Sequence, residues 1–249
     1  MRVVISIGGS VLAPDLDSRR VDTTAGAVTR VDAHAESIQS IVDGGWEVGA
    51  VVGGGGVARD YIHAARDLGA NEVQLDQIGI DVTRINARLL IASLGDVVDP
   101  TPAREYDEAA NAVRRGDVAV MGGVTAGQTT DAVAAALAEY IGADLLVYAT
   151  SVDGVYDADP ATDPDAQKYD RLTPGELVDV IVPMSRDAGA AAPVDLLAAK
   201  LIERAGMRAV VLDGTDPERI EAAVLDGEHS GTDIAPVDAD RATTDTADR

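Results

Sequence analysis

The sequence predicts a three-layer α/β/α sandwich with a mainly parallel central sheet, and two observations lead to this fold class. Short apolar runs rich in β-branched residues, typical of buried strands, alternate with helical patterns from end to end. The chain has 249 residues, 46% of them hydrophobic, which is enough to bury one large core. Because parallel strands need crossover connections, the helices between them are expected to cover both faces of the sheet.

The first quarter of the chain alternates strands with helices that are ended or opened by glycine. The expected elements, in order, are the strand Arg2–Ile7, the turn Gly8-Gly-Ser10, a loop over Pro14–Ala33, the helix Ala35–Asp43, the strand Trp46–Val52 and a helix that opens at Val57. Ile38, Ile41 and Val42 are expected on the inner side of the first helix, which Gly44-Gly45 ends. Four glycines between the second strand and its helix indicate that the backbone there lies against a ligand or another backbone segment.

A longer helix follows, over the region Asp76–Leu94. Its apolar residues Ile78, Val82, Ile85 and Leu89 recur with a 4-3-4 spacing, which predicts one buried face. Asp76 is expected to begin this helix as its cap. A further helix is expected at Pro102–Arg115.

The stretch Val118–Tyr140 is the one around which the chain is organised. The apolar run Val118–Met121 indicates the central strand, and Gly122, Gly123 and Gly127 then let the backbone turn sharply and approach a ligand. A glycine-rich turn that ends at a helix N-terminus offers free N–H groups and a positive dipole to a phosphate. The alternative is an ordinary, well-capped connection between a strand and a helix.

Capping residues and an alanine-rich helix complete that stretch. Thr129–Asp131 supply the cap chemistry, and Val133, Leu137 and Ile141 share one face of the helix. The rest of the chain continues the alternation, with strands at Asp144–Ala149 and Arg208–Leu212, helices at Pro174–Val182, Val194–Ala205 and Asp216–Leu225, and a short strand at Ile234–Pro236.

Composition narrows the class of function. The net charge is −23, and only Lys168 and Lys200 of the 20 basic residues are lysines, so we expect a folded protein adapted to very high salt. Basic patches for nucleic acid and apolar runs of 18 residues for a membrane span are both absent. The absence of cysteine and of a signal-peptide pattern leads us to expect a cytoplasmic protein.

Several common site motifs are missing. No Gly-Lys pair exists for a P-loop, and the three histidines lack ligand spacing, so no metal site built by the protein is expected. Gly53-x-Gly55-x-x-Ala58 loosely fits a dinucleotide fingerprint, but the acidic residue at the right distance, Asp76, starts a helix instead of ending a strand. Arg59 falls early in a helix, where a cation is unfavourable unless a phosphate lies nearby.

Four motifs together resemble the amino acid kinase family, and most closely its archaeal uridylate kinases. They are Ile7-Gly-Gly-Ser10, Val51-Val-Gly-Gly-Gly55 with Ala58-Arg59, the run Gly122–Ala135, and Thr150-Ser-Val-Asp-Gly-Val-Tyr-Asp-Ala-Asp-Pro160. The likeness covers residues 1–236 and leaves 237–249 as an acidic tail that we expect to be disordered. It implies a single domain whose N-terminal lobe, 1–142, binds the phosphate acceptor and whose C-terminal lobe, 143–236, binds ATP.

The resemblance implies reversible phosphoryl transfer from ATP, carried with Mg²⁺, to UMP in pyrimidine nucleotide synthesis, by a homohexamer. The residues that would hold ATP are Gly9, Ser10, Gly55, Arg59, Thr150, Tyr156 and Asp159. Those that would hold UMP are Gly54, Asp76, Val124, Thr125, Ala126, Gly127, Gln128, Thr129 and Thr130. Arg59 and Lys200 are the candidate catalytic cations. In an acidic chain, the aspartates that follow Thr150 could equally serve only as turn residues.

Two departures from the family pattern keep alternatives open. Many relatives carry a lysine where this chain has Ser6, and Val124–Ala126 with Gln128 replaces a loop that holds histidine and proline in some archaeal relatives. The first departure leaves the catalytic cation undecided, and the second leaves the acceptor undecided. The rivals are a kinase of the same fold for isopentenyl phosphate, acetylglutamate, carbamate or aspartate, and a non-catalytic protein that binds nucleotides or stores oxyanions.

Overall fold

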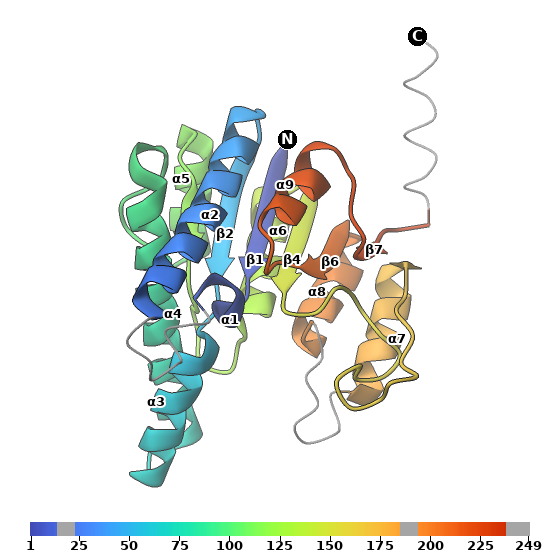
Figure 1. Ribbon diagram of the computed structural model, residues 1–249, viewed down its shortest axis with the longest axis horizontal. Helices are drawn as coiled ribbons and strands as arrows, with labels where there is room; N and C mark the ends of the chain where they lie inside the picture. The colour runs from blue at the N-terminus through green and yellow to red at the C-terminus, as the bar shows by residue number, and fades with distance from the viewer. Residues whose placement is uncertain (14–22, 185–193, 238–249) are drawn as a thin grey trace.

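The computed structural model describes residues 1–13, 23–184 and 194–237, which contain a sheet with the strand order β3-β2-β1-β4-β6-β7-β5 (Figure 1). Its strands are β1 (Arg2–Ile7), β2 (Glu47–Val52), β3 (Ala119–Met121), β4 (Leu145–Thr150), β5 (Arg171–Leu172), β6 (Ala209–Asp213) and β7 (Thr232–Ile234). The pairs from β3 across to β6 are parallel, and β7 runs antiparallel to β6. Residues 238–249 of the expected tail lie outside the described residues.

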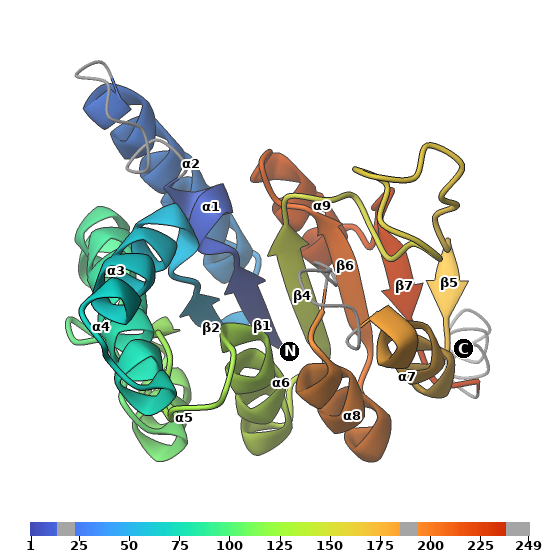
Figure 2. The ribbon, with the colours of Figure 1, turned by 90° about the horizontal axis from the view of Figure 1, so that it is seen from below.

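The helices connect these strands as crossovers. They are α1 (Gly9–Leu12), α2 (Thr23–Asp43), α3 (Gly55–Asp67), α4 (Glu72–Leu94), α5 (Tyr106–Arg115), α6 (Thr130–Ile141), α7 (Pro174–Met184), α8 (Leu196–Ala205) and α9 (Glu218–Leu225). Figure 2 shows α2 and α9 on one side of the sheet and α6 and α8 on the other. The described helices therefore form the two outer layers that the sequence predicts.

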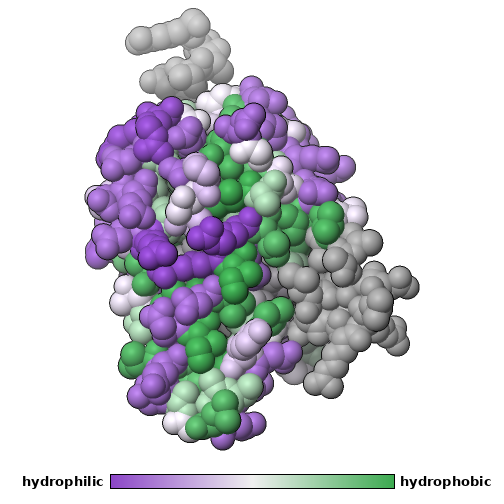
Figure 3. Space-filling view, turned by 90° about the vertical axis from the view of Figure 1, so that its left-hand side faces the viewer, coloured by the Kyte–Doolittle hydropathy of each residue, from purple (hydrophilic) through white to green (hydrophobic). Residues whose placement is uncertain are grey.

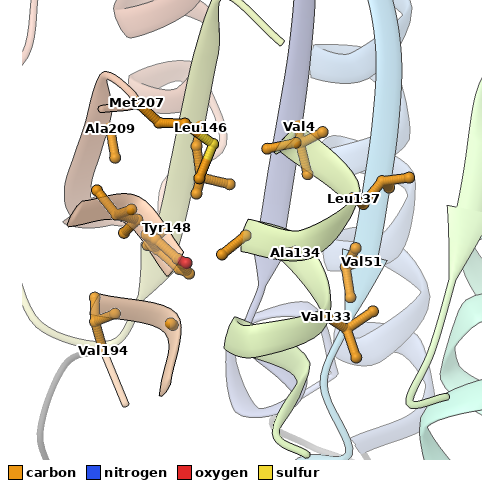
Figure 4. Close-up of a cluster of buried hydrophobic side chains, with 14 of the residues drawn as sticks. Val4, Val51, Val133, Ala134, Leu137, Leu146, Tyr148, Val194, Met207 and Ala209 are labelled. Atoms are coloured by element: carbon orange, nitrogen blue, oxygen red, sulfur yellow. The ribbon is translucent and has the colours of Figure 1, made fainter. Parts of the chain in front are cut away.

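Two apolar clusters fill the space between the layers, because successive strand side chains point to opposite faces. On β1, Val3 and Ile5 belong to the cluster that includes residues of α2, α4 and α9, while Val4 belongs to the cluster that includes residues of α5 and α6. Val133 and Leu137 of α6 are fully buried, as their spacing predicts, and Figure 4 shows them against the sheet.

The register of the strands creates the functional edge. Ile7 at the end of β1 pairs with Val52 at the end of β2 and with Ala149 near the end of β4. Three parallel strands therefore finish side by side, and the turns that follow them meet at one edge of the sheet. Ligands of open α/β sheets bind at this kind of edge.

Three sequence-based expectations are wrong. β3 lies at the edge of the sheet and not at its centre, because the crossover connections place β1 and β4 in the middle of the strand order. α2 begins at Thr23, so the loop expected over Pro14–Ala33 is helical from residue 23 onward.

The third concerns α4, where only part of the expected row faces the core: Val82 is buried and Ile78 is half-buried. Leu75, Ile80, Val82, Ala87 and Leu90 are buried, whereas Ile85 is 58% exposed and Leu89 38% exposed. α4 carries apolar residues on all of its sides, so a single periodic row in the sequence does not identify the side that faces the core.

None of the helices in the described residues is both long enough and apolar enough to cross a bilayer.

Candidate active site

The turns at the carboxyl ends of β1, β2 and β4 enclose a cleft of about 320 Å³. The residues that line it are Ser6, Gly8, Gly9, Ser10, Val11, Gly53, Gly54, Gly55, Arg59, Thr130, Asp131, Ala149, Thr150, Ser151 and Val152. Most of this lining is backbone and hydroxyl, so the cleft offers hydrogen-bond donors with few side chains in the way.

The first glycine corner follows β1. The Gly8 N–H donates to the carbonyl of Ala149 at 3.0 Å, which ties the corner to β4, and α1 begins at Gly9. A Cβ built on Gly9 would lie 2.2 Å from the backbone nitrogen of Gly55. Only glycine allows the corner after β1 to touch the corner after β2 so closely.

The second glycine corner follows β2 and opens α3. Gly55 has φ +66°, a conformation that glycine adopts without strain. The amide of Asn86, which is 3% exposed, donates to the carbonyls of Gly53 at 2.8 Å and Gly54 at 3.2 Å. Sequence reasoning did not find Asn86, although a polar residue within an apolar helix pattern was the available signal.

Arg59 projects from α3 into the cleft. Its guanidinium donates to the Ser10 hydroxyl at 3.4 Å, and no carboxylate among the described residues forms an ion pair with it. In a chain with a net charge of −23, an arginine that faces a glycine-lined cleft without an acidic partner has its charge available for an anion.

The third glycine corner, after β3, is held against α4. The Thr83 hydroxyl accepts the Gly123 N–H at 2.7 Å, and a Cβ on Gly122 would lie 2.4 Å from that same oxygen. Further along, the Asp76 carboxylate accepts the Gly127 N–H at 2.8 Å. The predicted acceptor loop is thereby tied to the helix through Asp76.

Asp76 is not the cap that the sequence suggested. Asn71 caps α4 through a reciprocal pair of bonds with Gln74, which places Asp76 inside the helix. The side chain of Asp76 is therefore free to reach the loop across from it.

The N-terminus of α6 contributes Thr130 and Asp131 to the lining of the cleft. Thr129 caps the helix by accepting the Ala132 N–H at 3.1 Å, and its hydroxyl bonds to the carboxylate of Asp195, which caps α8. The Ser6 hydroxyl donates to the Asp131 carboxyl at 3.3 Å. Enclosure by protein and the nearby Asp195 carboxylate raise the pKa of Asp131 to about 7, against the opposite effects of bonds from Ser6 and from the Asp195 N–H.

The loop after β4 is built around Asp153. The Tyr156 hydroxyl donates to Asp153 at 2.6 Å and the Lys168 ammonium donates to it at 2.9 Å. The hydrogen bond from Tyr156 and the bond and charge of Lys168 lower the pKa of Asp153 despite some burial. Asp159 accepts the Ala161 N–H at 2.9 Å, as a turn residue does.

The structure brings together only part of the predicted set. Seven predicted residues line the cleft: Gly9, Ser10, Gly54, Gly55, Arg59, Thr130 and Thr150. Tyr156, Asp159 and Asp76 lie outside its lining. Val124 and Thr125 line a separate hollow of about 720 Å³.

Lys200, a candidate catalytic cation, does not reach the cleft. It lies on the exposed side of α8 and forms an ion pair with Glu203 at 2.8 Å. The helix buries Ala198, Ala199 and Ile202 instead, because its apolar row faces α6 and α7.

Comparison with known proteins decides the family. Residues 1–213 match the model of the amino acid kinase family. The chain belongs to the amino acid kinase family.

Within this family the similarity extends over nearly the whole chain. The sequence is 71% identical over 238 residues to a uridylate kinase of Haloquadratum walsbyi, covering 96% of this chain and 95% of that protein. It is 63% identical over 248 residues to a uridylate kinase of Halobacterium salinarum, covering 100% of this chain and 99% of that one. The crystal structure of uridylate kinase from Archaeoglobus fulgidus matches with a TM-score of 0.80 and 44% identity over 94% of this chain and 100% of that chain.

These findings confirm the predicted family and fold class. The lining of the cleft also includes Ser6 and Asp131, which the sequence analysis named as a departure from the family pattern and as a helix cap but did not predict as ligand contacts. Their signal in the sequence was weak, since a serine inside a strand and an aspartate at a helix start are both common.

Proposed function

We propose that this chain is a UMP kinase, which transfers the γ-phosphoryl group of ATP to UMP and yields ADP and UDP reversibly. The observation that carries the proposal is the cleft, which glycine corners and the N-terminus of α6 line together with Arg59, an arginine that has no ion-pair partner in the described parts of the chain. The uridylate kinases that share more than 60% identity with the chain support the choice of acceptor. The proposed setting is pyrimidine nucleotide synthesis in the cytoplasm.

In phosphoryl transfer the protein mainly positions the two substrates, and its side chains need not form covalent bonds with them. A phosphate oxygen of UMP attacks the γ-phosphorus of ATP, and ADP leaves, so no side-chain nucleophile is needed. The first N–H groups of α3, from Gly55 onward, and those of α6, from Thr130 onward, have no acceptor inside their helices and can bind phosphate oxygens. Arg59 supplies positive charge to the same oxygens.

In this proposal the two substrates meet in the cleft, and each extends beyond its lining to further contacts. ATP lies along the corner after β1 and the loop after β4, with Gly9, Ser10, Thr150, Tyr156 and Asp159 as its contacts. UMP lies between Gly54 and the loop from Val124 to Thr130, which Asp76 ties to α4 through Gly127. Because Lys200 is paired with Glu203 outside the cleft, the proposal assigns the role of catalytic cation to Arg59 alone.

The cleft suits a magnesium ion that arrives with ATP. No group of three or more acidic or histidine side chains that could hold a metal occurs in the described parts of the chain. Mg²⁺ keeps several waters and is commonly held by substrate phosphates, and the hydroxyls of Ser10 and Ser151 offer it oxygen donors from the protein. When bound, the ion neutralises charge on the phosphates.

We further propose that the chain assembles as a homohexamer, with α4 in a subunit interface. Figure 3 shows the side of the molecule that α3, α4 and α5 form, where hydrophobic areas run between hydrophilic ones. The exposed apolar side chains of these helices include Tyr61, Val73, Ile85 and Leu89. An apolar area of this kind is what an interface between subunits covers.

A coupled assay tests the proposed reaction. Purified protein in molar KCl with ATP and Mg²⁺ is expected to consume UMP far faster than CMP, AMP or isopentenyl phosphate. A preference for one of the other acceptors would reject UMP as the substrate. Nucleotide binding with no turnover of any acceptor would favour a storage protein of the same fold.

A further inference from the structure

A buried amide on α4 holds the glycine corner that follows β2. Asn86 is 3% exposed, and Ala87 and Leu90 beside it in the helix are fully buried. Its amide nitrogen lies 2.8 Å from the carbonyl oxygen of Gly53 and 3.2 Å from that of Gly54. Because carbonyl oxygens only accept hydrogen bonds, the NH₂ end of the amide must face both of them. A buried amide costs free energy unless it is bonded, and these two bonds meet that need.

These two bonds fix the direction of the next two N–H groups. In a trans peptide the C=O and N–H bonds point to opposite sides. With the carbonyls of Gly53 and Gly54 turned towards Asn86, the N–H groups of Gly54 and Gly55 point away from α4. The three glycines line the cleft, whereas α4 contributes no residue to its lining in the described parts of the chain. Asn86 therefore turns both N–H groups to the side on which the cleft lies.

The backbone at this corner has the conformation of an anion-binding nest. Gly54 is right-handed, with φ −84° and ψ −29°, whereas Gly55 has φ +66°. Successive residues of opposite hand turn their N–H groups towards one point, and concave stretches of this kind bind phosphates. Within the described residues, neither of these N–H groups has a backbone acceptor. The nest Gly54–Gly55 can therefore bind phosphate oxygens on one side while Asn86 bonds the carbonyls on the other.

We propose that Asn86 is a positioning residue for phosphoryl transfer, which aims the N–H groups of the nest at the phosphoryl group that is transferred. The inference rests on the proposed function, in which Gly54 contacts UMP and Gly55 contacts ATP. The nest then lies where the phosphates of the two nucleotides meet. Asn86 touches neither nucleotide and acts only through the main chain of this corner.

Fixed N–H donors matter more to the transition state than to the bound nucleotides. Charge on the transferred group shifts among its oxygens as the bond to ADP breaks. Donors that are already aimed at these oxygens stabilise the charge without having to reorient during the reaction. Without Asn86, the peptides of Gly53 and Gly54 lose the bonds that fix their planes, and glycine resists rotation less than any other residue. We therefore expect the loss of Asn86 to lower kcat more than it raises KM.

Asn86→Leu tests this role, because leucine keeps the size and shape of asparagine and has no donor. The coupled assay on the full chain, with ATP, Mg²⁺ and UMP in molar KCl, measures kcat and both KM values well below the melting temperature. In this variant kcat is expected to fall by about 100-fold, as it does when a preorganised donor is lost. KM for ATP is expected to rise only about fivefold, the effect of a single hydrogen bond in the ground state.

Ser37→Ala is the matched control, because it removes the same kind of bond far from the cleft. Ser37 of α2 is 5% exposed, and its hydroxyl donates to the main-chain carbonyl of Pro217 at 2.9 Å, at the start of α9. This variant is expected to lose melting temperature and to keep the kcat of the wild type. If Asn86→Leu folds poorly, Asn86→Ala removes the amide without adding a branched side chain, and the same difference between kcat and KM is expected of it.

The outcomes separate this inference from the proposed reaction. A wild-type kcat in a folded Asn86 variant, or a loss of kcat equal to that of Ser37→Ala, would overturn the role of Asn86 even if UMP is phosphorylated. If the wild type binds ATP and phosphorylates no acceptor, the proposed function is rejected, and calorimetric titration of ATP then tests the nest. An affinity about fivefold weaker in Asn86→Leu would support the aiming of its N–H groups by Asn86, and an equal affinity would overturn it.

Discussion

Gly9→Ala is expected to damage the cleft because two backbone turns touch at this residue. The added Cβ would lie 2.2 Å from the nitrogen of Gly55, 2.5 Å from the carbonyl oxygen of Gly53 and 2.5 Å from the carbonyl carbon of Gly54. All three atoms belong to the main chain, so no side-chain rotation can relieve the contact. Reaching an ordinary separation requires the corner after β1 to move by about 1 Å from the corner after β2.

The size of the effect follows from that displacement. Overpacking of this kind costs about 1–3 kcal/mol of stability. At about 2–4 °C per kcal/mol for a chain of this size, the melting temperature is expected to fall by roughly 2–12 °C. A displacement of about 1 Å between catalytic groups lowers rates by about 100-fold, so kcat/KM for the transfer is expected to fall by that order.

Gly175→Ala is the matched control, assayed in the same way. Its Cβ would meet nothing closer than the Glu203 carboxylate at 3.9 Å, near the start of α7, so activity is expected to stay unchanged. Thermal unfolding and the coupled assay in molar KCl measure both variants. A Gly9→Ala protein with the melting temperature and kcat/KM of the wild type would refute the reasoning that these two corners must touch.

Four other predictions follow from the same structure. Arg59→Ala is expected to lower kcat/KM by about 10- to 150-fold, the loss of one charged hydrogen bond of about 1.5–3 kcal/mol, with unchanged thermal unfolding; a wild-type rate would remove Arg59 from the site. Asp76→Ala frees the Gly127 N–H and is expected to raise KM for UMP about tenfold with little change in KM for ATP, and equal effects on both substrates would contradict that assignment. Asp131→Asn is expected to unfold at a higher temperature than the wild type at pH 8, and this difference in melting temperature should disappear towards pH 4. The folded protein raises the pKa of Asp131 to about 7, so ionising this carboxyl destabilises the fold. The destabilisation grows as the pH rises from the pKa of the unfolded chain to that of the folded protein. With a net charge of −23, the wild type is expected to gain stability as KCl is raised from dilute to molar, where the screening length is about 3 Å; greatest stability in dilute buffer would reject adaptation to salt.

Local patterns were enough to determine the fold class and the chemistry of the backbone corners. Alternating strand and helix patterns predict the two helical layers, and glycines after Ile7, Val52 and Met121 predict turns where backbone is left bare. These features depend on residues within a few positions of each other. The inner face of α6 was found for the same reason, since Val133 and Leu137 stand one turn apart.

Only the tertiary structure decided which corners meet and which charges face them. Strand order depends on crossover connections, so β3 could not be placed at the edge of the sheet from its own residues. The bond from Gly127 to Asp76 joins residues 51 positions apart, and Thr129 bonds to Asp195 over 66. Contacts between residues so far apart in the sequence produce no periodic pattern in the sequence, because they form only when whole helices and strands pack together.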